Sequence, residues 1–286
     1  GLCMKKKYTF IAAVAVLSII TAIPAYASGW KSDSKGWWYE YADGTFPKST
    51  WAQLSSGGKT SWYCFNPDGY MYSNAITPDG YFMSDSGEWT VLGKAYMDIL
   101  SSTTKFTHLV SVGSRYNGNE SKLIDHGSYY EVTNMEFQTN KLYDLNLSNV
   151  HENDIITLDN EKLHIRDIDK TYEHYSLWAS LTNGGEYYSG YLTLAEDGKH
   201  YYRCTAEDDC IYQETLYHGP VYFSKNCIVN ELSLETNEPT HLPLSLKDHF
   251  NKDLNDSRYS SKYYIDCTYE MDKNGLITQM DQMYLP

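Results

Sequence analysis

The pattern of hydrophobic and polar positions divides the chain into three stretches. A mostly apolar stretch extends from Phe10 to Ile23, shortly after a basic run. Residues 28–89 contain hardly any Leu, Ile or Val, and their apolar positions are mostly aromatic rings separated by turns rich in Gly and Asp. From about residue 104 onwards, apolar and polar side chains alternate in longer segments, which predicts β-strands. We therefore expect a mainly β fold made of two differently built regions.

The first stretch predicts a secretory signal peptide. A basic run at residues 5–7 follows Met4, and the apolar run leads into Ala25-Tyr26-Ala27, a small-x-small pattern that indicates cleavage after residue 27. Residues 1–3 precede the initiator methionine that this pattern implies, so we treat them as upstream residues. No later segment approaches the roughly 18 apolar residues that a membrane span needs. We expect residues 1–27 to be removed and the mature protein to be secreted without a membrane span.

The aromatic region, residues 28–92, repeats a short unit. Trp30 and Trp51 stand 21 residues apart, and a Trp-Tyr pair follows each of them, at residues 38–39 and 62–63. Asp-Gly turns at 43–44, 68–69 and 79–80 are hairpin signals, because Asp and Gly accept the backbone angles of tight turns. A short aromatic hairpin cannot bury a face alone, whereas a stack of such hairpins can. The spacing therefore predicts a small solenoid of β-hairpins.

Two segments of this region carry a resemblance to a known family. "GWWYEYADGTFPKSTW" and "SWYCFNPDGYM" resemble the choline-binding, or cell-wall-binding, repeats of surface proteins from Gram-positive bacteria. Those repeats have the form Gly-Trp, a spacer, Trp-Tyr-Tyr-Phe, Asp-x-x-Gly and then an aromatic residue or Met. The resemblance covers residues 29 to about 89. It implies hairpins wound into a solenoid, with rings of neighbouring hairpins forming cages for the choline groups of teichoic acids.

Mapped by motif position, the resemblance implies two such cages. The first would combine Trp30 and Trp38 with Tyr63 of the next hairpin, and the second would combine Trp51 and Trp62 with Tyr81. A quaternary ammonium group has no N–H donor, but the negative faces of Trp and Tyr attract it with about 0.5–2 kcal/mol per contact.

The repeats depart from the family pattern at two positions. Cys64 stands at the second position of the usual Tyr-Tyr pair, and Ile76 stands where a further Gly-Trp is expected. We therefore expect the third hairpin to lack a tryptophan wall. The alternative interpretation is that the rings only hold the hairpins together, as cross-strand aromatic pairs do.

The region from 93 to 286 predicts a β-rich domain. It contains the strand "SYYEVTNMEFQ", a strand pair turned at Asp159-Asn160 and a meander over residues 174–204. Residues 263–271 then alternate strictly, until Asn274-Gly275 turns the chain into "LITQMDQMYL". Short helices are predicted at 92–100 and, after a capping pattern, near 246–253. These elements favour a small β-barrel or β-sandwich with a few short helices.

The net charge of the mature chain narrows the choice of binding partners. Removal of residues 1–27 takes three lysines and no acid from 23 basic and 37 acidic side chains, which leaves a formal charge of −17. This negative charge excludes nucleic acid as a partner and suits a cationic ligand.

Five cysteines remain after cleavage. Four of them allow three disulfide pairings, one of which joins Cys204 to Cys210 and Cys227 to Cys267. The alternative is that the thiols are buried and unbonded. No spacing suggests zinc, so we expect neither metal nor cofactor.

The sequence contains no motif that by itself indicates catalysis. It has no Gly-x-Ser-x-Gly elbow, no His-Glu-x-x-His and no phosphate loop. Cys227 or Cys267 beside a histidine, or the acids Asp208-Asp209, would need partners that the sequence cannot place. We expect a non-enzymatic protein at the cell wall, with choline or other teichoic-acid components as partners and an unknown protein or glycan ligand for residues 93–286. The alternatives are an exported enzyme acting on cell-wall or carbohydrate substrates, and an adhesin or structural protein whose repeats do not bind choline.

Overall fold

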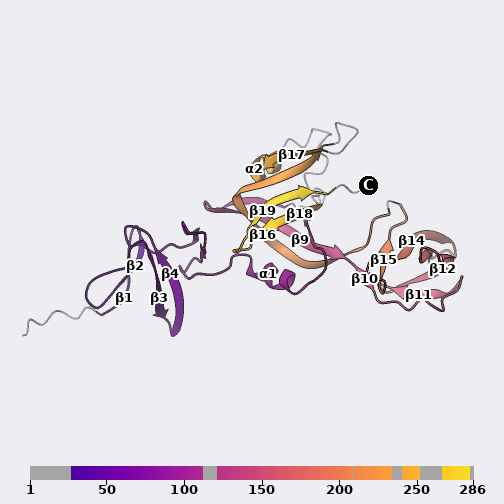
Figure 1. The fold of residues 1–286 in the computed structure, drawn as a ribbon, viewed down its shortest axis with the longest axis horizontal. Helices are drawn as coiled ribbons and strands as arrows, with labels where there is room; N and C mark the ends of the chain where they lie inside the picture. The colour runs from indigo at the N-terminus through magenta and orange to yellow at the C-terminus, as the bar shows by residue number, and fades with distance from the viewer. Residues whose placement is uncertain (1–26, 112–120, 208, 234–239, 252–265, 284–286) are drawn as a thin grey trace, which may run out of the picture.

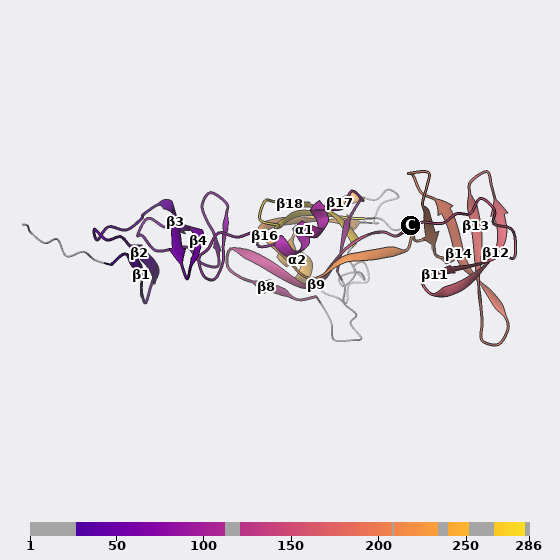
Figure 2. The ribbon, with the colours of Figure 1, turned by 90° about the horizontal axis from the view of Figure 1, so that it is seen from below.

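The structure, a computed structural model, describes residues 27–111, 121–207, 209–233, 240–251 and 266–283. Three β-structures follow one another along its long axis: stacked hairpins, a seven-stranded sheet and a six-stranded sheet (Figures 1 and 2). The mainly β prediction is confirmed. The predicted signal peptide lies outside the described residues, apart from Ala27. No helix in the described part of the chain is long and apolar enough to cross a membrane.

The aromatic region folds into three antiparallel hairpins. Their strands are β1 (Gly29–Asp33), β2 (Gly36–Glu40), β3 (Thr50–Ser56), β4 (Lys59–Phe65), β5 (Ala75–Ile76) and β6 (Phe82–Met83). Gly44, Gly69 and Gly80 have φ values of 80°, 92° and 80°, a conformation that glycine adopts without strain. Trp30 of the first hairpin packs against Tyr63 and Phe65 of the second, so neighbouring hairpins share a small aromatic core.

The seven-stranded sheet follows a short helix, α1 (Lys94–Ser101). Its strands are β7 (His108–Ser111), β8 (Leu123–Asp125), β9 (Tyr129–Asn140), β16 (Gln213–Ser233), β17 (Thr240–Ser245), β18 (Asp266–Met271) and β19 (Ile277–Gln282). The spatial order is β17-β16-β19-β18-β7-β9-β8, with β16 also pairing along β9. Tyr96 of α1 is fully buried against Phe137 and Tyr217, which anchors the helix on the core of this sheet.

The six-stranded sheet is inserted between β9 and β16. Its strands are β10 (Leu142–Tyr143), β11 (Ile155–Leu158), β12 (Glu161–Asp169), β13 (His174–Ser180), β14 (Glu186–Leu194) and β15 (Tyr201–Cys204). The order β10-β15-β14-β13-β12-β11 leaves β10 and β11 as edges, and the sheet lies at the opposite end of the molecule from the hairpins (Figure 1). Its buried side chains form a second hydrophobic core. Residues 93–286 therefore contain two sheets with separate cores.

The short-range predictions agree with the structure. Asp159 and Asn160 turn β11 into β12 with φ values of 49° and 66°, and the turn at 272–275 joins β18 to β19. The second helix, α2 (Leu246–Asn251), begins after Ser245, whose hydroxyl accepts a hydrogen bond from the Asp248 amide at 3.1 Å. The remainder of the predicted 246–253 helix lies outside the described residues, as do positions 263–265.

The described cysteine thiols are not bonded to one another. Cys64, Cys204, Cys227 and Cys267 are buried, and Cys210 is partly exposed. The structure therefore corresponds to the unbonded alternative, in which the thiols act as small buried side chains.

Candidate functional site

The strand register decides which tryptophans share a face of each hairpin. In an antiparallel pair, residues directly opposite each other point to the same side, and so does the residue two positions along. Trp30 pairs with Tyr39 in the first hairpin, which puts Trp37 on the face of Trp30 and Trp38 on the opposite face. Grouping Trp38 with Trp30 was therefore wrong. A shift of one residue along a strand moves a side chain to the other face.

The second hairpin repeats this register. Trp51 pairs with Cys64, which puts Trp62 on the face of Trp51 and Tyr63 on the other face. The segment Trp37-Trp38-Tyr39 is thus equivalent to Trp62-Tyr63-Cys64. Trp37, rather than Trp38, corresponds to Trp62.

Cage 1 lies between the first and second hairpins. Its walls are Trp30, Trp37, Tyr63 and Met71, around a cavity of about 440 Å³. The ring centroids of Trp30 and Tyr63 are 4.7 Å apart, at an interplanar angle of 63°. Tyr63 is buried, whereas Trp37 keeps 52% of its surface exposed. The cavity therefore has a buried ring in one wall and a solvent-exposed ring in another.

Cage 2 lies between the second and third hairpins. Its walls are Trp51, Trp62, Tyr81 and Trp89, around a cavity of about 340 Å³. The structure thus brings together the three residues that were expected for this cage. Tyr81 meets Trp51 and Trp89 nearly edge to face, with centroids 5.5 Å and 6.0 Å apart. Trp62 and Trp89 are 44% and 47% exposed, which leaves ring surface open to solvent.

The two cages are built alike in the backbone as well. The Met71 amide donates to the Trp37 carbonyl at 2.7 Å, and the Trp89 amide donates to the Trp62 carbonyl at 2.8 Å. Met71 follows Tyr63 by eight residues, and Trp89 follows Tyr81 by the same number. Sequence reasoning missed Trp37 and Trp89, although Trp89 stands two residues after a turn glycine, at the family's "aromatic or Met" position.

Carboxylates give both cages a negative character. Asp85 and Glu88 line cage 1, and Asp79 lines cage 2. Among the described residues, the lining of cage 1 includes no Lys or Arg. A hydrogen bond from the Lys59 ammonium, at 2.7 Å, is the main cause that lowers the pKa of Glu88. The Thr77 hydroxyl, which donates to Asp79 at 2.6 Å, is the main cause that lowers the pKa of Asp79. Both groups are therefore ionised at neutral pH.

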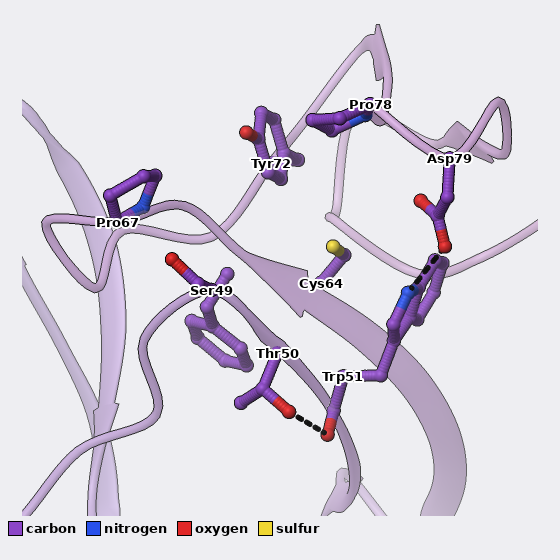
Figure 3. Close-up of a pocket in the computed structure, with 9 residues that line it drawn as sticks. Ser49, Thr50, Trp51, Cys64, Pro67, Tyr72, Pro78 and Asp79 are labelled. Atoms are coloured by element: carbon purple, nitrogen blue, oxygen red, sulfur yellow. Dashed lines mark hydrogen bonds between the residues drawn. The ribbon is translucent and has the colours of Figure 1, made fainter.

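Asp79 also fixes the orientation of a cage wall. The Trp51 indole Nε1–H donates to the Asp79 carboxylate at 2.9 Å (Figure 3). A second cavity, of about 320 Å³, lies beside these two residues and has Cys64 in its lining. Cys64 is equivalent to Tyr39, whose ring packs 5.4 Å from Trp30 in the first hairpin. The small thiol thus leaves space where the first hairpin has a phenol ring.

The other candidate groups do not form an equipped reaction centre among the described residues. Burial raises the pKa of Cys227 to about 12 and that of Cys267 well above its usual value, which leaves both thiols protonated and poorly nucleophilic. Asp208 lies outside the described residues. No group of three or more His, Cys, Asp or Glu side chains within the described ranges could hold a metal ion.

Sequence comparisons find no match to a protein-family model. They also find no match among curated proteins.

Comparison with solved structures finds modular cell-wall proteins at low similarity. The Cpl-1 endolysin, solved with a peptidoglycan analogue, is 17% identical, with a TM-score of 0.21; the match covers 63% of this chain and 38% of that protein. The autolysin LytC from Streptococcus pneumoniae is 11% identical, with a TM-score of 0.21 and coverage of 91% and 48%. The choline-binding domain of CbpL from Streptococcus pneumoniae is 16% identical, with a TM-score of 0.13 and coverage of 61% and 87%.

The matches to Cpl-1 and LytC span less than half the length of those enzymes. TM-scores of 0.21 and below support no conclusion about this chain. Any function must therefore be inferred from the cages themselves.

Proposed function

We propose that this protein binds quaternary ammonium groups of the choline type through cages 1 and 2. One observation carries the proposal: two cavities with the same register each combine partly exposed indole rings, a tyrosine and a lining carboxylate. Ring faces attract a cation that has no proton to donate, and the carboxylates add charge attraction. Volumes of about 440 and 340 Å³ lie within the range of small-molecule sites, roughly 300–1,000 Å³.

The strength of each cage follows from its ring contacts. At about 0.5–2 kcal/mol for each ring, the three rings of cage 1 give roughly 1.5–6 kcal/mol and the four rings of cage 2 give roughly 2–8 kcal/mol. The middle of these ranges, about 4–5 kcal/mol, corresponds to dissociation constants of about 0.2–1 mM. A polymer that carries many choline groups would engage both cages at once, which raises its apparent affinity above that of either cage. We therefore propose a choline-bearing cell-wall polymer as the natural partner and the cell wall as the location of the secreted protein.

Retention on a choline-bearing resin tests this proposal. The mature protein should bind the resin and elute with free choline, because both compete for the same ring faces. The double variant Trp37→Ala, Trp62→Ala should be retained much less, since each cage loses one exposed indole. Trp178→Ala, which removes the one tryptophan outside the hairpin region, is the matched control and should bind as the unmodified protein does.

If the unmodified protein binds neither the resin nor purified cell wall, the proposal is refuted. A double variant that binds as well as the unmodified protein would place any attachment outside the cages.

For the two sheets we propose a non-enzymatic role, as the part of the molecule displayed at the wall. The high pKa values of the Cys227 and Cys267 thiols support this proposal, since neither is a ready nucleophile. Incubation of the mature protein with peptidoglycan and wall glycans, followed by product analysis, should release no fragments. Released fragments would instead support the enzyme alternative.

A further inference from the structure

The third hairpin has lost the two ring positions that begin a cage. Ile76 pairs with Phe82 as Trp51 pairs with Cys64, and Gly80, two residues before Phe82, is therefore equivalent to Trp62. A Cβ atom at Gly80 would meet Lys273 Nζ at 3.7 Å and its Cε at 3.8 Å. The lysine side chain thus lies where an indole at this position would begin.

Lys273 reaches this position because the turn between β18 and β19 docks on the third hairpin. The side-chain amide of Asn274 donates to the Gly80 carbonyl at 2.9 Å and accepts from the Phe82 amide at 3.2 Å. The Asn274 carbonyl accepts from the Gly93 amide at 2.8 Å. Asn274 is only 2% exposed, so this turn is a fixed contact between the hairpins and the seven-stranded sheet.

The docked lysine lies on a wall of cage 2. Its ammonium is 3.3 Å from the centroid of the Tyr81 ring and donates to the Asp79 carbonyl at 3.2 Å. Lys273 does not line the cage 2 cavity, so its ammonium contacts the Tyr81 ring from outside that cavity. In cage 1, the corresponding Tyr63 donates its hydroxyl to Glu88 at 3.4 Å, and no described ammonium lies over its ring.

We infer that Lys273 lowers the affinity of cage 2 for a quaternary ammonium ligand and thereby links this cage to the docked sheet. The inference rests on the proposed function. A fixed positive charge behind Tyr81 repels a second cation across the ring, which corresponds to about a two- to sixfold loss of affinity at low salt. Linkage is reciprocal, so a ligand in cage 2 weakens the contact between Lys273 and Tyr81 by the same factor.

The test uses choline chloride as the probe and isothermal titration of the mature protein. The Trp37→Ala background weakens cage 1 about fivefold, so that cage 2 is the stronger site in the titration. Adding Lys273→Met should tighten choline binding about two- to sixfold at low salt, and the gain should shrink as NaCl is added. Lys273→Arg keeps the charge and should bind as the Trp37→Ala parent does. Lys48→Met, which removes another lysine near an aromatic ring of the hairpins, should also leave the affinity unchanged.

A second background checks that the effect belongs to cage 2. In the Trp62→Ala background cage 2 is weakened and cage 1 is the stronger site, so Lys273→Met should not change the choline affinity of that stronger site. If cage 2 binds choline equally well with and without Lys273, the inference is overturned and the proposed function still stands. Cages that bind no choline in either background would overturn the proposed function and the inference with it. Lys273 is exposed, so its replacement does not disturb a core.

Discussion

The neighbouring residues Trp37 and Trp38 allow a sharp test of the cage geometry. Trp37 lines cage 1 beside Trp30 and Tyr63, whereas Trp38 points to the other face of the same hairpin. Removal of one half-exposed indole from a three-ring cage should cost about 1 kcal/mol, or about a fivefold loss of choline affinity. Trp38→Ala should change the affinity less than about twofold. The Trp38 ring lies 6.0 Å from that of Tyr70, and neither of these residues lines cage 1.

The measurement is isothermal titration with choline in the Trp62→Ala background, where cage 2 is weakened and cage 1 is the stronger site. Thermal melting of both variants controls for folding, and Trp37→Ala should melt close to its parent because 52% of the Trp37 surface is already in solvent. Equal losses for the two variants, or a larger loss for Trp38→Ala, would show that the register assigned to this cage does not govern binding.

Three further predictions concern charge, backbone and pH. Asp79→Asn keeps a hydrogen-bond acceptor but removes the charge, so choline binding at cage 2 should weaken about two- to fivefold by titration; with the lowered pKa of Asp79, the affinity of the unmodified cage should stay flat from about pH 8 to pH 5. Gly190→Ala should lower the free energy of unfolding by at least about 2 kcal/mol in urea titration, because its φ is +128° and its Cβ would lie 1.9 Å from the Cys204 carbonyl oxygen. A smaller loss would mean that the backbone relaxes there. Burial opposes a charged His108 ring, but its hydrogen bond and ion pair with Asp266 outweigh burial and raise the pKa of His108 above 6.5. The pair therefore stabilises the fold fully below about pH 6.5 and less as the pH rises through the raised value, so the melting advantage over Asp266→Asn should shrink as the pH is raised above about 6.5. A constant advantage would contradict this sign.

Features set by a few neighbouring residues could be predicted from the sequence. The turn at Asp159-Asn160 and the helix cap at Ser245 depend on local backbone preferences, and both are present. Cage 2 was assembled from the sequence as far as Trp51, Trp62 and Tyr81, because the repeat spacing places equivalent rings on consecutive hairpins.

The first cage was assigned one residue out of register. "GWWYE" offers two adjacent tryptophans, and alignment of Trp38-Tyr39 with Trp62-Tyr63 selected the wrong one. Only pairing with the opposite strand shows which indole faces the next hairpin. The sequence did contain a usable signal. An apolar residue follows each of Trp38, Tyr63 and Tyr81 by eight positions, which marks these three residues as equivalent.

The contact between the third hairpin and the β18–β19 turn could not be predicted from local patterns. Asn274 bonds to Gly80, 194 residues earlier in the chain. The residue type and turn at 274–275 predict a hairpin, but nothing in the sequence states which backbone groups its amide will meet. Such contacts depend on the packing of whole sheets, which residue spacing does not encode.

The six-stranded sheet is inserted at one point of the central sheet, between the end of β9 and the start of β16. Asn140 pairs with Gln213, and the Lys141 amide donates to the Tyr212 carbonyl at 2.8 Å, so the chain departs and returns at adjacent points. Because β9 and β16 are already antiparallel neighbours, a tight turn has the geometry needed to join residues 140 and 213 directly. Residues 141–212 are therefore inserted without interrupting the central sheet, whose strands β9 and β16 remain paired up to the point where the chain departs and returns.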